Sequence, residues 1–483
     1  MPASTATDEN ISAGRWWLIP VVAAGTLLTV FVLTRPPAMS GDSVAVLRGA
    51  KLILRCVRAS VFARCDASVP DVSQGVAPYP PYQYVPALLL TWLGAGDAAV
   101  YRTFSALNTF SFLGLLALGA GMPRMTGRPG LTAAVMCTVI ASPLLWYAWS
   151  TFGELLAAFL IATFLSAALR RSRPALLLVT LYLAGITKET ALPFLLLAGG
   201  VALWATPIGR GPFRRAHAQA LVGGSILVVL SHAGLNWFRF GTLHNAIYSG
   251  SVFHVPGVGL RGQLFASLSV SPNAGIAWFW PTATALLTGL GVIAVKRFRS
   301  HRHDYRAWVP AAVITMIGLT QSALLASWWA PFGWFAWGPR LSLSFVPGLV
   351  LIGSVLHAED VEKGLHWLGR STTRLAVAIA ALSVLTLPQV GILWRSDVLG
   401  AFFATKSGAP LCPSIDPDPA YYYGCLLDAA WSTPPLLLAA GRGVTDGWGP
   451  LYAAAFCGAG SHLLLRASRP GCYRPQRQAV RSS

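Results

Sequence analysis

The sequence predicts an all-α polytopic membrane protein that forms a single membrane domain over 1–483. Of its 483 residues, 54% are hydrophobic and only 11% are charged, and the mean hydropathy is +0.57. A soluble domain carries about 25% charged residues, so this chain has too little polar side chain to face water on all sides. Helices that satisfy their own backbone groups are the structures that such a chain can form within a bilayer.

Apolar runs of about 20 residues predict membrane-spanning helices. We expect about 12 of them, over 16–34, 98–121, 131–149, 152–169, 174–187, 190–205, 218–237, 276–295, 309–327, 339–357, 375–394 and 448–465. The first run follows only Arg15 and is long enough to span, so its pattern is not that of a cleavable signal. The segment 84–95 is apolar but short, and we expect it to be interfacial or re-entrant.

The charges predict the orientation. With both termini in the cytoplasm, the short inside segments carry 22 of the 36 Lys and Arg residues but 6 of the 17 acids, as the positive-inside rule requires. The bases are divided among several loops instead of being gathered on one domain. The net charge of +19 therefore indicates orientation and contact with anionic membrane lipid, and it argues against a nucleic-acid partner.

Three regions on the predicted outer side are large: 35–84, 238–275 and 395–447. The first contains Cys56 and Cys65, and the last contains Cys412 and Cys425. Two local pairs in an oxidising compartment favour two disulfides, and four free thiols are the alternative.

Charged residues at the span ends gather on the outer face. They are Asp42, Glu154, Lys188, Glu189, Arg239, His244 and Arg340. Lys188 and Glu189 interrupt a long apolar stretch, where a charged pair is costly if it faces lipid, so we expect it to be functional. Helix-end charges without a common role would divide between both faces, so this clustering predicts one polar site at the outer interface.

The residue types suit a substrate that has a lipid tail, a phosphate and a polar head. Carboxylates act as bases, while Lys and Arg neutralise phosphates. Aromatic side chains stack on sugars or anchor at the headgroup level, and the candidates for a substrate groove are Tyr79, Tyr82, Trp328 and Trp337. Each type also has a structural alternative, since acids cap helices and lysines extend toward the interface.

The sequence supports neither a cofactor nor a metal. It contains no compact group of His, Asp and Glu with the spacing of metal ligands, although a divalent metal stays open. It also lacks a glycine-rich motif of the kind that cradles phosphates.

Six segments have the same order along the chain, and lie on the same side of the membrane, as corresponding segments of one known superfamily. They are SGDS (40–43), YPPYQY (79–84), SPLLWY…FGELL (142–156), GITKETAL (185–192), NWFRFGTLHNAIY (236–248) and WGPR…P (337–347). With these segments the chain resembles the GT-C superfamily of integral membrane glycosyltransferases, which use polyprenyl-phosphate sugars. It resembles most the bacterial relatives of protein O-mannosyltransferases and of lipid A aminoarabinose transferases.

The resemblance implies a GT-C-like fold in the bacterial inner (plasma) membrane, with its active site on the outer side. Asp42 takes the place of the catalytic base, although Gly41 stands where some relatives carry a second acid. Glu154 matches a further acid of the family. Lys188 and Arg340 are the candidates for holding the phosphate of the donor.

The resemblance also implies the reaction. A mannose or another hexose or pentose would pass from the lipid phosphate to a hydroxyl acceptor in one displacement, with inversion. Glu189, Arg239 and His244 would support the site, and the outer region 395–447 would shape the choice among lipid, polysaccharide and protein acceptors. The alternatives are a flippase or transporter of lipid-linked sugars and a scaffold subunit. Carriers usually place their polar groups near the bilayer midplane, which favours the enzyme.

Overall fold

The structure is a computed structural model. It describes residues 25–26, 28–32, 34–38, 41–59, 80–121, 125–126, 128–170, 172–188, 190–205, 212–245, 256–328, 331–332, 337–338, 340–394 and 419–431. These parts of the chain are mainly helical, as the composition predicts, and their extended backbone includes a parallel bridge between Ala38 and Ser150.

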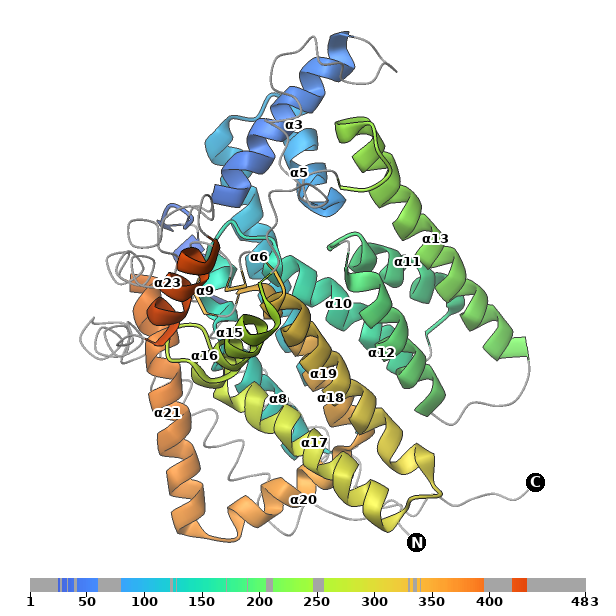
Figure 1. Cartoon of the computed structure of the whole chain (residues 1–483), viewed down its shortest axis with the longest axis vertical. Helices are drawn as coiled ribbons and strands as arrows, with labels where there is room; N and C mark the ends of the chain where they lie inside the picture. The colour runs from blue at the N-terminus through green and yellow to red at the C-terminus, as the bar shows by residue number, and fades with distance from the viewer. Residues whose placement is uncertain are drawn as a thin grey trace, which may run out of the picture.

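Figure 1 shows the arrangement of the described helices. They are α3 (Gly41–Ala59), α5 (Pro81–Trp92), α6 (Asp97–Ala120), α8 (Pro129–Ile140), α9 (Leu144–Trp149), α10 (Glu154–Leu169), α11 (Pro174–Gly185), α12 (Ala191–Ala205), α13 (Pro212–Phe240), α15 (Val258–Val270), α16 (Ile276–Phe279), α17 (Pro281–Ser300), α18 (Tyr305–Ala326), the 3₁₀ turn η1 (Arg340–Ser342), α19 (Val346–Leu356), α20 (Ala358–Gly369), α21 (Thr372–Trp394) and α23 (Pro419–Trp431).

Several predicted spans coincide with these helices. Three described helices are long and apolar enough to cross a membrane: Asp97–Ala120, Arg215–Phe240 and Tyr305–Ala326. Helices α10, α11, α12 and α19 are apolar but shorter. The chain is therefore a helical membrane protein, while the count of twelve spans stays a prediction, and the predicted span 448–465 lies outside the described residues.

Three predicted spans are wrong as continuous helices. The run 131–149 divides into α8 and α9 around Pro143, and the run 276–295 divides into α16 and α17 before Pro281. The run 339–357 begins as the 3₁₀ turn η1 and becomes α-helical only at Val346, which precedes Pro347. Proline lacks the backbone N–H that a helix interior needs, so each helix restarts with its proline in or just before the first turn.

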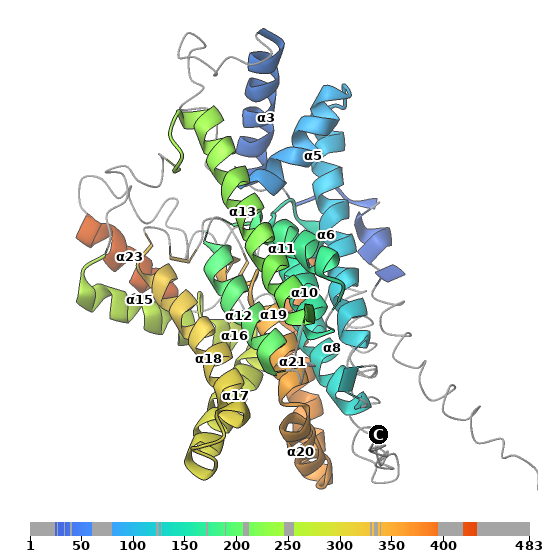
Figure 2. The same cartoon turned by 90° about the vertical axis from the view of Figure 1, so that its right-hand side faces the viewer.

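The region 35–84 contains helix α3, and α5 covers most of the short apolar segment 84–95. The two helices pack on each other through Val46, Ala50 and Tyr84, which are at most 1% exposed. Figures 1 and 2 show α3 extending beyond the remaining helices at one end of the molecule. The central and last outer regions also contain helices, α15 and α23.

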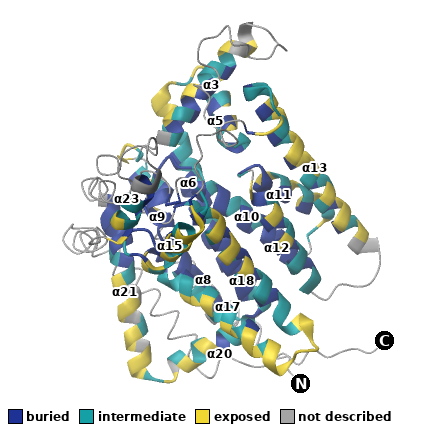
Figure 3. Cartoon of the chain, in the orientation of Figure 1, coloured by how far each residue is buried: buried dark blue, intermediate teal, exposed yellow. Residues whose placement is uncertain are grey.

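Helix α10 is the centre of the packing. It contacts α6, α11, α12 and α19, and Figure 3 shows it buried along most of its length. A helix that is apolar on all sides is suited to such a position. Helix α13 lies at the periphery, where Val222, Val229 and Leu230 are more than half exposed, at 60%, 55% and 61%. These side chains form a surface suited to lipid.

Two neighbouring glycines of α12 test the packing between α10 and α12. A Cβ at Gly199 would lie 2.5 Å from Cζ of Phe164, whereas a Cβ at Gly200 would meet no atom within 4 Å. We expect Gly199→Ala to lower the free energy of unfolding by about 1–3 kcal/mol through overpacking. Gly200→Ala is the matched control and should be neutral or slightly stabilising, because alanine favours helix. Thermal melting of both variants in one detergent checks this, and equal melting temperatures would contradict it.

Candidate active site

An extended segment between α9 and α10 forms the frame of the site. The side-chain amide of Asn108, on α6, donates to the carbonyl oxygens of Ser150 at 2.8 Å and Phe152 at 2.6 Å. The backbone N–H of Thr151 donates to the carbonyl of Ala38 at 3.0 Å. Buried backbone groups need such partners. The amide of Asn108 and the carbonyl of Ala38 supply them where the chain has no helical hydrogen bonds. The segment therefore delivers Glu154 at the first position of α10.

The start of α3 is tied to the same segment. The hydroxyl groups of Ser43 and Thr151 lie 2.7 Å apart and share a hydrogen bond. Asp42 directly precedes Ser43 in the first turn of α3, so this bond brings Asp42 next to the start of α10. Acids in a first helical turn are stabilised by the helix dipole, which suits both Asp42 and Glu154.

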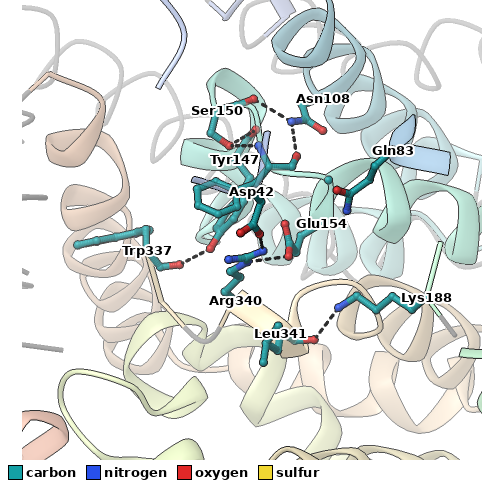
Figure 4. A network of polar contacts seen from close by, with 12 residues as sticks. Asp42, Gln83, Asn108, Tyr147, Ser150, Glu154, Lys188, Trp337, Arg340 and Leu341 are labelled. Atoms are coloured by element: carbon teal, nitrogen blue, oxygen red, sulfur yellow. Dashed lines mark hydrogen bonds and ion pairs between the residues drawn. The ribbon is translucent and has the colours of Figure 1, made fainter. Parts of the chain in front are cut away.

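The guanidinium of Arg340 joins the two acids (Figure 4). Its Nε donates to Oε1 of Glu154 at 2.7 Å, and its Nη2 donates to Oδ2 of Asp42. The side chains of Arg340 and Glu154 are 9% and 5% exposed, and that of Asp42 is 20% exposed. The plane of Arg340 also lies over Phe152, with Cζ 4.4 Å from the ring centroid. Buried carboxylates need such compensation, and Asp42 is the one open to a ligand.

Lys188 places a second positive charge beside Glu154. Its ammonium donates to the carbonyl of Leu341 at 3.3 Å, and it lies in the turn between α11 and α12. Burial lowers the pKa of Lys188, and the nearby carboxylate of Glu154 offsets only part of this shift. The site therefore combines two carboxylates and two cationic side chains. One carboxylate oxygen, the buried Oε2 of Glu154, still lacks a hydrogen-bond donor among the described residues.

A tight turn before η1 positions Arg340. Gly338 adopts φ +70°, and a Cβ there would lie 3.0 Å from Phe279, so only glycine fits this turn without strain. The carbonyl of Trp337 accepts a hydrogen bond from the hydroxyl of Tyr147 at 2.9 Å, and its indole donates to Oε1 of Gln389 at 2.7 Å. These bonds hold the turn on α9 and α21, so the direction of Arg340 is fixed by buried contacts.

A small hollow adjoins the acids. Residues of α3, α5, α6 and α10 and of the link before α10 line it. The polar residues of the lining are Ser43, Tyr82, Gln83, Asn108 and Thr151, and the rest of it is mainly apolar. The hydroxyl of Tyr82 donates to the carbonyl of Gly153 at 2.6 Å. Burial raises the pKa of Tyr82 far above its ordinary value, so this group stays a donor.

Other candidates from the sequence lie elsewhere. The prediction that Trp337 lines a groove is wrong for this structure, because its indole is 0% exposed and packs edge-on against Phe279. Arg239 is buried beside Tyr84 and donates to Asn236 at 2.7 Å. His244 is exposed, and Trp328 is half-buried beyond the end of α18. Their roles at the site stay predictions.

Some predicted residues lie outside the described residues: Tyr79, Glu189, Cys65 and Cys412. Cys56 belongs to α3, but its side chain is not described. Cys425 is disulfide-bonded, and its pairing with Cys412 stays a prediction.

The sequence did not single out the residues that hold the frame. Asn108 and Gln389 lie within predicted spans, where a polar side chain is costly without a partner. That cost was a usable signal for both. The bond between Ser43 and Thr151 had no such signal, because short hydroxyl side chains are common at helix ends. No group of His, Cys, Asp and Glu among the described residues has the arrangement of a metal site.

No protein-family model matches the chain, and no curated protein matches it. Among solved structures, the chain is similar to the crystal structure of ArnT from Cupriavidus metallidurans in the apo state. The TM-score is 0.46 and the sequence identity is 15%, over 94% of this chain and 78% of the other. At this TM-score the likeness does not assign a family.

Removal of the guanidinium tests the compensation of the two acids. Arg340→Gln leaves the carboxylate of Glu154 buried with only Lys188 nearby, so we expect a loss of about 3–5 kcal/mol in unfolding free energy. The double variant Glu154→Gln/Arg340→Gln removes the buried negative charge as well and should recover part of the loss. Arg261→Gln is the matched control, because the guanidinium of Arg261 donates to the carbonyl of Pro256 and pairs with no acid among the described residues. Thermal melting checks all three, and an Arg340→Gln variant as stable as the wild type would contradict the expectation.

Proposed function

We propose that the protein is a membrane glycosyltransferase, which moves a sugar from a polyprenyl-phosphate donor to a hydroxyl acceptor. One observation carries this proposal. Asp42 and Glu154, from distant parts of the chain, meet on the guanidinium of Arg340 beside Lys188. A partly open acid next to two cations suits proton removal and phosphate binding in the same site. The order of the GT-C-like segments supports the same class.

The reaction divides between the acid and the cations. Asp42 takes the proton of the acceptor hydroxyl while the oxygen of that hydroxyl forms a bond to the anomeric carbon. The bond from that carbon to the phosphate oxygen breaks, and polyprenyl phosphate leaves with the electron pair. Arg340 and Lys188 stabilise the charge on this phosphate, since Arg presents a fork and Lys a point charge. A single displacement inverts the anomeric centre, and the mechanism needs no nucleotide.

The pairing of Arg340 with Asp42 implies an exchange when the donor binds. The described cluster holds two carboxylates and two cationic side chains, so its charges balance before a phosphate arrives. The phosphate adds negative charge and competes with Asp42 for the Nη2 side of Arg340. We infer that the guanidinium keeps its bond to Glu154 and turns toward the phosphate. Asp42 is then released to act as a base only in the presence of the donor.

The proposal extends to location and partners. The site would face the outer side of a bacterial inner membrane, with both termini in the cytoplasm. The donor would be a polyprenyl-phosphate mannose or another hexose or pentose, and the acceptor a lipid, polysaccharide or protein of the cell envelope. The small hollow beside the acids is lined by both polar and apolar residues. No cofactor takes part in these steps.

Loss of the proposed base should stop transfer. We expect Asp42→Asn to reduce sugar transfer about 10²–10⁴-fold, the usual contribution of a general base. Asp97→Asn is the matched control, because Asp97 forms an exposed ion pair with Lys51 at 2.7 Å, and exposed pairs contribute less than about 1 kcal/mol. The assay follows label from a polyprenyl-phosphate sugar in membranes. Transfer retained in Asp42→Asn would remove Asp42 as the base, and label that crosses the membrane without transfer would indicate a carrier.

The exchange at Arg340 has a separate readout. A water-soluble carbodiimide with an amine labels accessible carboxyl groups, and peptide mass spectrometry locates the label. We expect polyprenyl phosphate to increase labelling of Asp42 several-fold, because the lipid phosphate takes the guanidinium from it. In Arg340→Gln the labelling should be high with or without the lipid, and labelling of Asp97 should not respond.

Binding of polyprenyl phosphate, measured in parallel, separates the two ideas. If the lipid binds and Asp42 labelling stays constant, the exchange is wrong while the proposed enzyme class stands. If the lipid phosphate does not bind, the proposed function itself is contradicted.

A further inference from the structure

A second polar surface lies at the end of the molecule away from α3. Helix α20 runs across from the lower end of α21 in Figure 1, and Figure 2 places it at the same end. It packs against α8, α19 and α21. Two of its residues, Ala358 and Val361, turn toward the core. Its crosswise course and its two unlike faces are typical of a helix that lies in a membrane interface.

The acids of this region are occupied within the protein. Asp360 pairs with Arg297 of α17 at 2.5 Å, and Glu362 pairs with Arg128, which precedes α8. Glu359 pairs with Lys363 on the exposed face at 2.7 Å. These pairs neutralise the three acids of α20, so they leave no negative charge over on its outward face.

The outward face of α20 and the start of α21 carry an aromatic ring and uncompensated cations. The indole of Trp367 is 58% exposed. Arg374 lies over this ring, with Cζ 4.1 Å from its centroid, and donates to the carbonyl of Trp367 at 3.0 Å. Arg370 is exposed beside them. Neither arginine pairs with an acid among the described residues, so both charges face outward.

The depth of this group follows from α21. Its exposed surface becomes apolar at Val377 and remains so at Val384, which are 63% and 60% exposed. A helix rises about 1.5 Å per residue, so Arg374 lies about one turn before this apolar surface begins. Helix α17 marks a similar boundary, since Val292 and Val295 are exposed at 56% and 52% and Arg299 follows. Trp367, Arg370 and Arg374 therefore lie at the level of lipid headgroups.

We propose that Trp367, Arg370 and Arg374 form a binding site for the headgroup of an anionic phospholipid. Arg370 and Arg374 contact its phosphate, and the indole of Trp367 lies at the glycerol level, where amphipathic rings are favoured. Charge complementarity selects this occupant, because the surface offers two cations without acids directly beside an apolar belt. This site is independent of the proposed transfer reaction.

The test measures lipid binding to the whole protein in an uncharged detergent. Phosphatidylglycerol or phosphatidylcholine is titrated, and bound lipid is followed by native mass spectrometry together with the melting temperature. We expect the wild type to prefer phosphatidylglycerol, and Arg370→Gln/Arg374→Gln to weaken that binding about tenfold. The matched control Arg299→Gln/Arg302→Gln removes the same charge from the α17–α18 turn at the same end of the molecule, and it should change the binding less than about twofold.

Trp367→Ala is the second variant, which keeps both charges and tests the ring. It should weaken phosphatidylglycerol binding several-fold. Equal binding of the two lipids by the wild type would overturn the site. So would unchanged binding in Arg370→Gln/Arg374→Gln, or an equal loss in the matched control, which would show that only the overall positive charge matters.

Discussion

The buried guanidinium of Arg340 is the contact on which the candidate site depends. A charge with 9% of its side chain exposed is tolerated only where opposite charges surround it. Here the compensation comes from Asp42 at the start of α3 and Glu154 at the start of α10. The three chain segments cannot separate without leaving charges buried and unpaired. The contact that occupies Asp42 thus also holds the site together.

The site lies where helices begin and end, not within their lengths. Three predicted spans are interrupted at or near prolines, and the turn before η1, which directly precedes one of these interruptions, positions Arg340. The link between α9 and α10 supplies the other part of the frame of the site. Backbone that is not helical must find partners inside a membrane protein. Asn108 supplies two of them to the link, while Tyr147 and Gln389 hold the turn. The polar residues within predicted spans are thus structural, and the charged ones at the span ends form the candidate site.

Charged side chains are buried and paired at one end of the molecule and partly exposed at the other. At the candidate site, acids and bases are buried and compensate one another. At α20, the acids pair with bases within the protein, and Arg370 and Arg374 remain open toward the surface. The net charge of +19 therefore reflects exposed bases more than the site itself. This division agrees with a protein whose chemistry lies at one membrane surface and whose basic face lies at the other.

The sequence by itself determined the class of the fold and the chemical types in the candidate site. Composition alone required helices in a membrane, and the cost of charge near apolar segments singled out seven residues at the outer span ends, of which Asp42, Glu154, Lys188 and Arg340 come together in the structure. It could not determine which of these residues touch, because a pairing between Asp42 and Arg340 depends on how distant helices pack. It also placed Trp337 in a groove, since an interfacial tryptophan and a core tryptophan have the same sequence pattern. Only the tertiary structure decided that its indole is enclosed and that one guanidinium joins both acids, because burial and contact are properties of the packed helices.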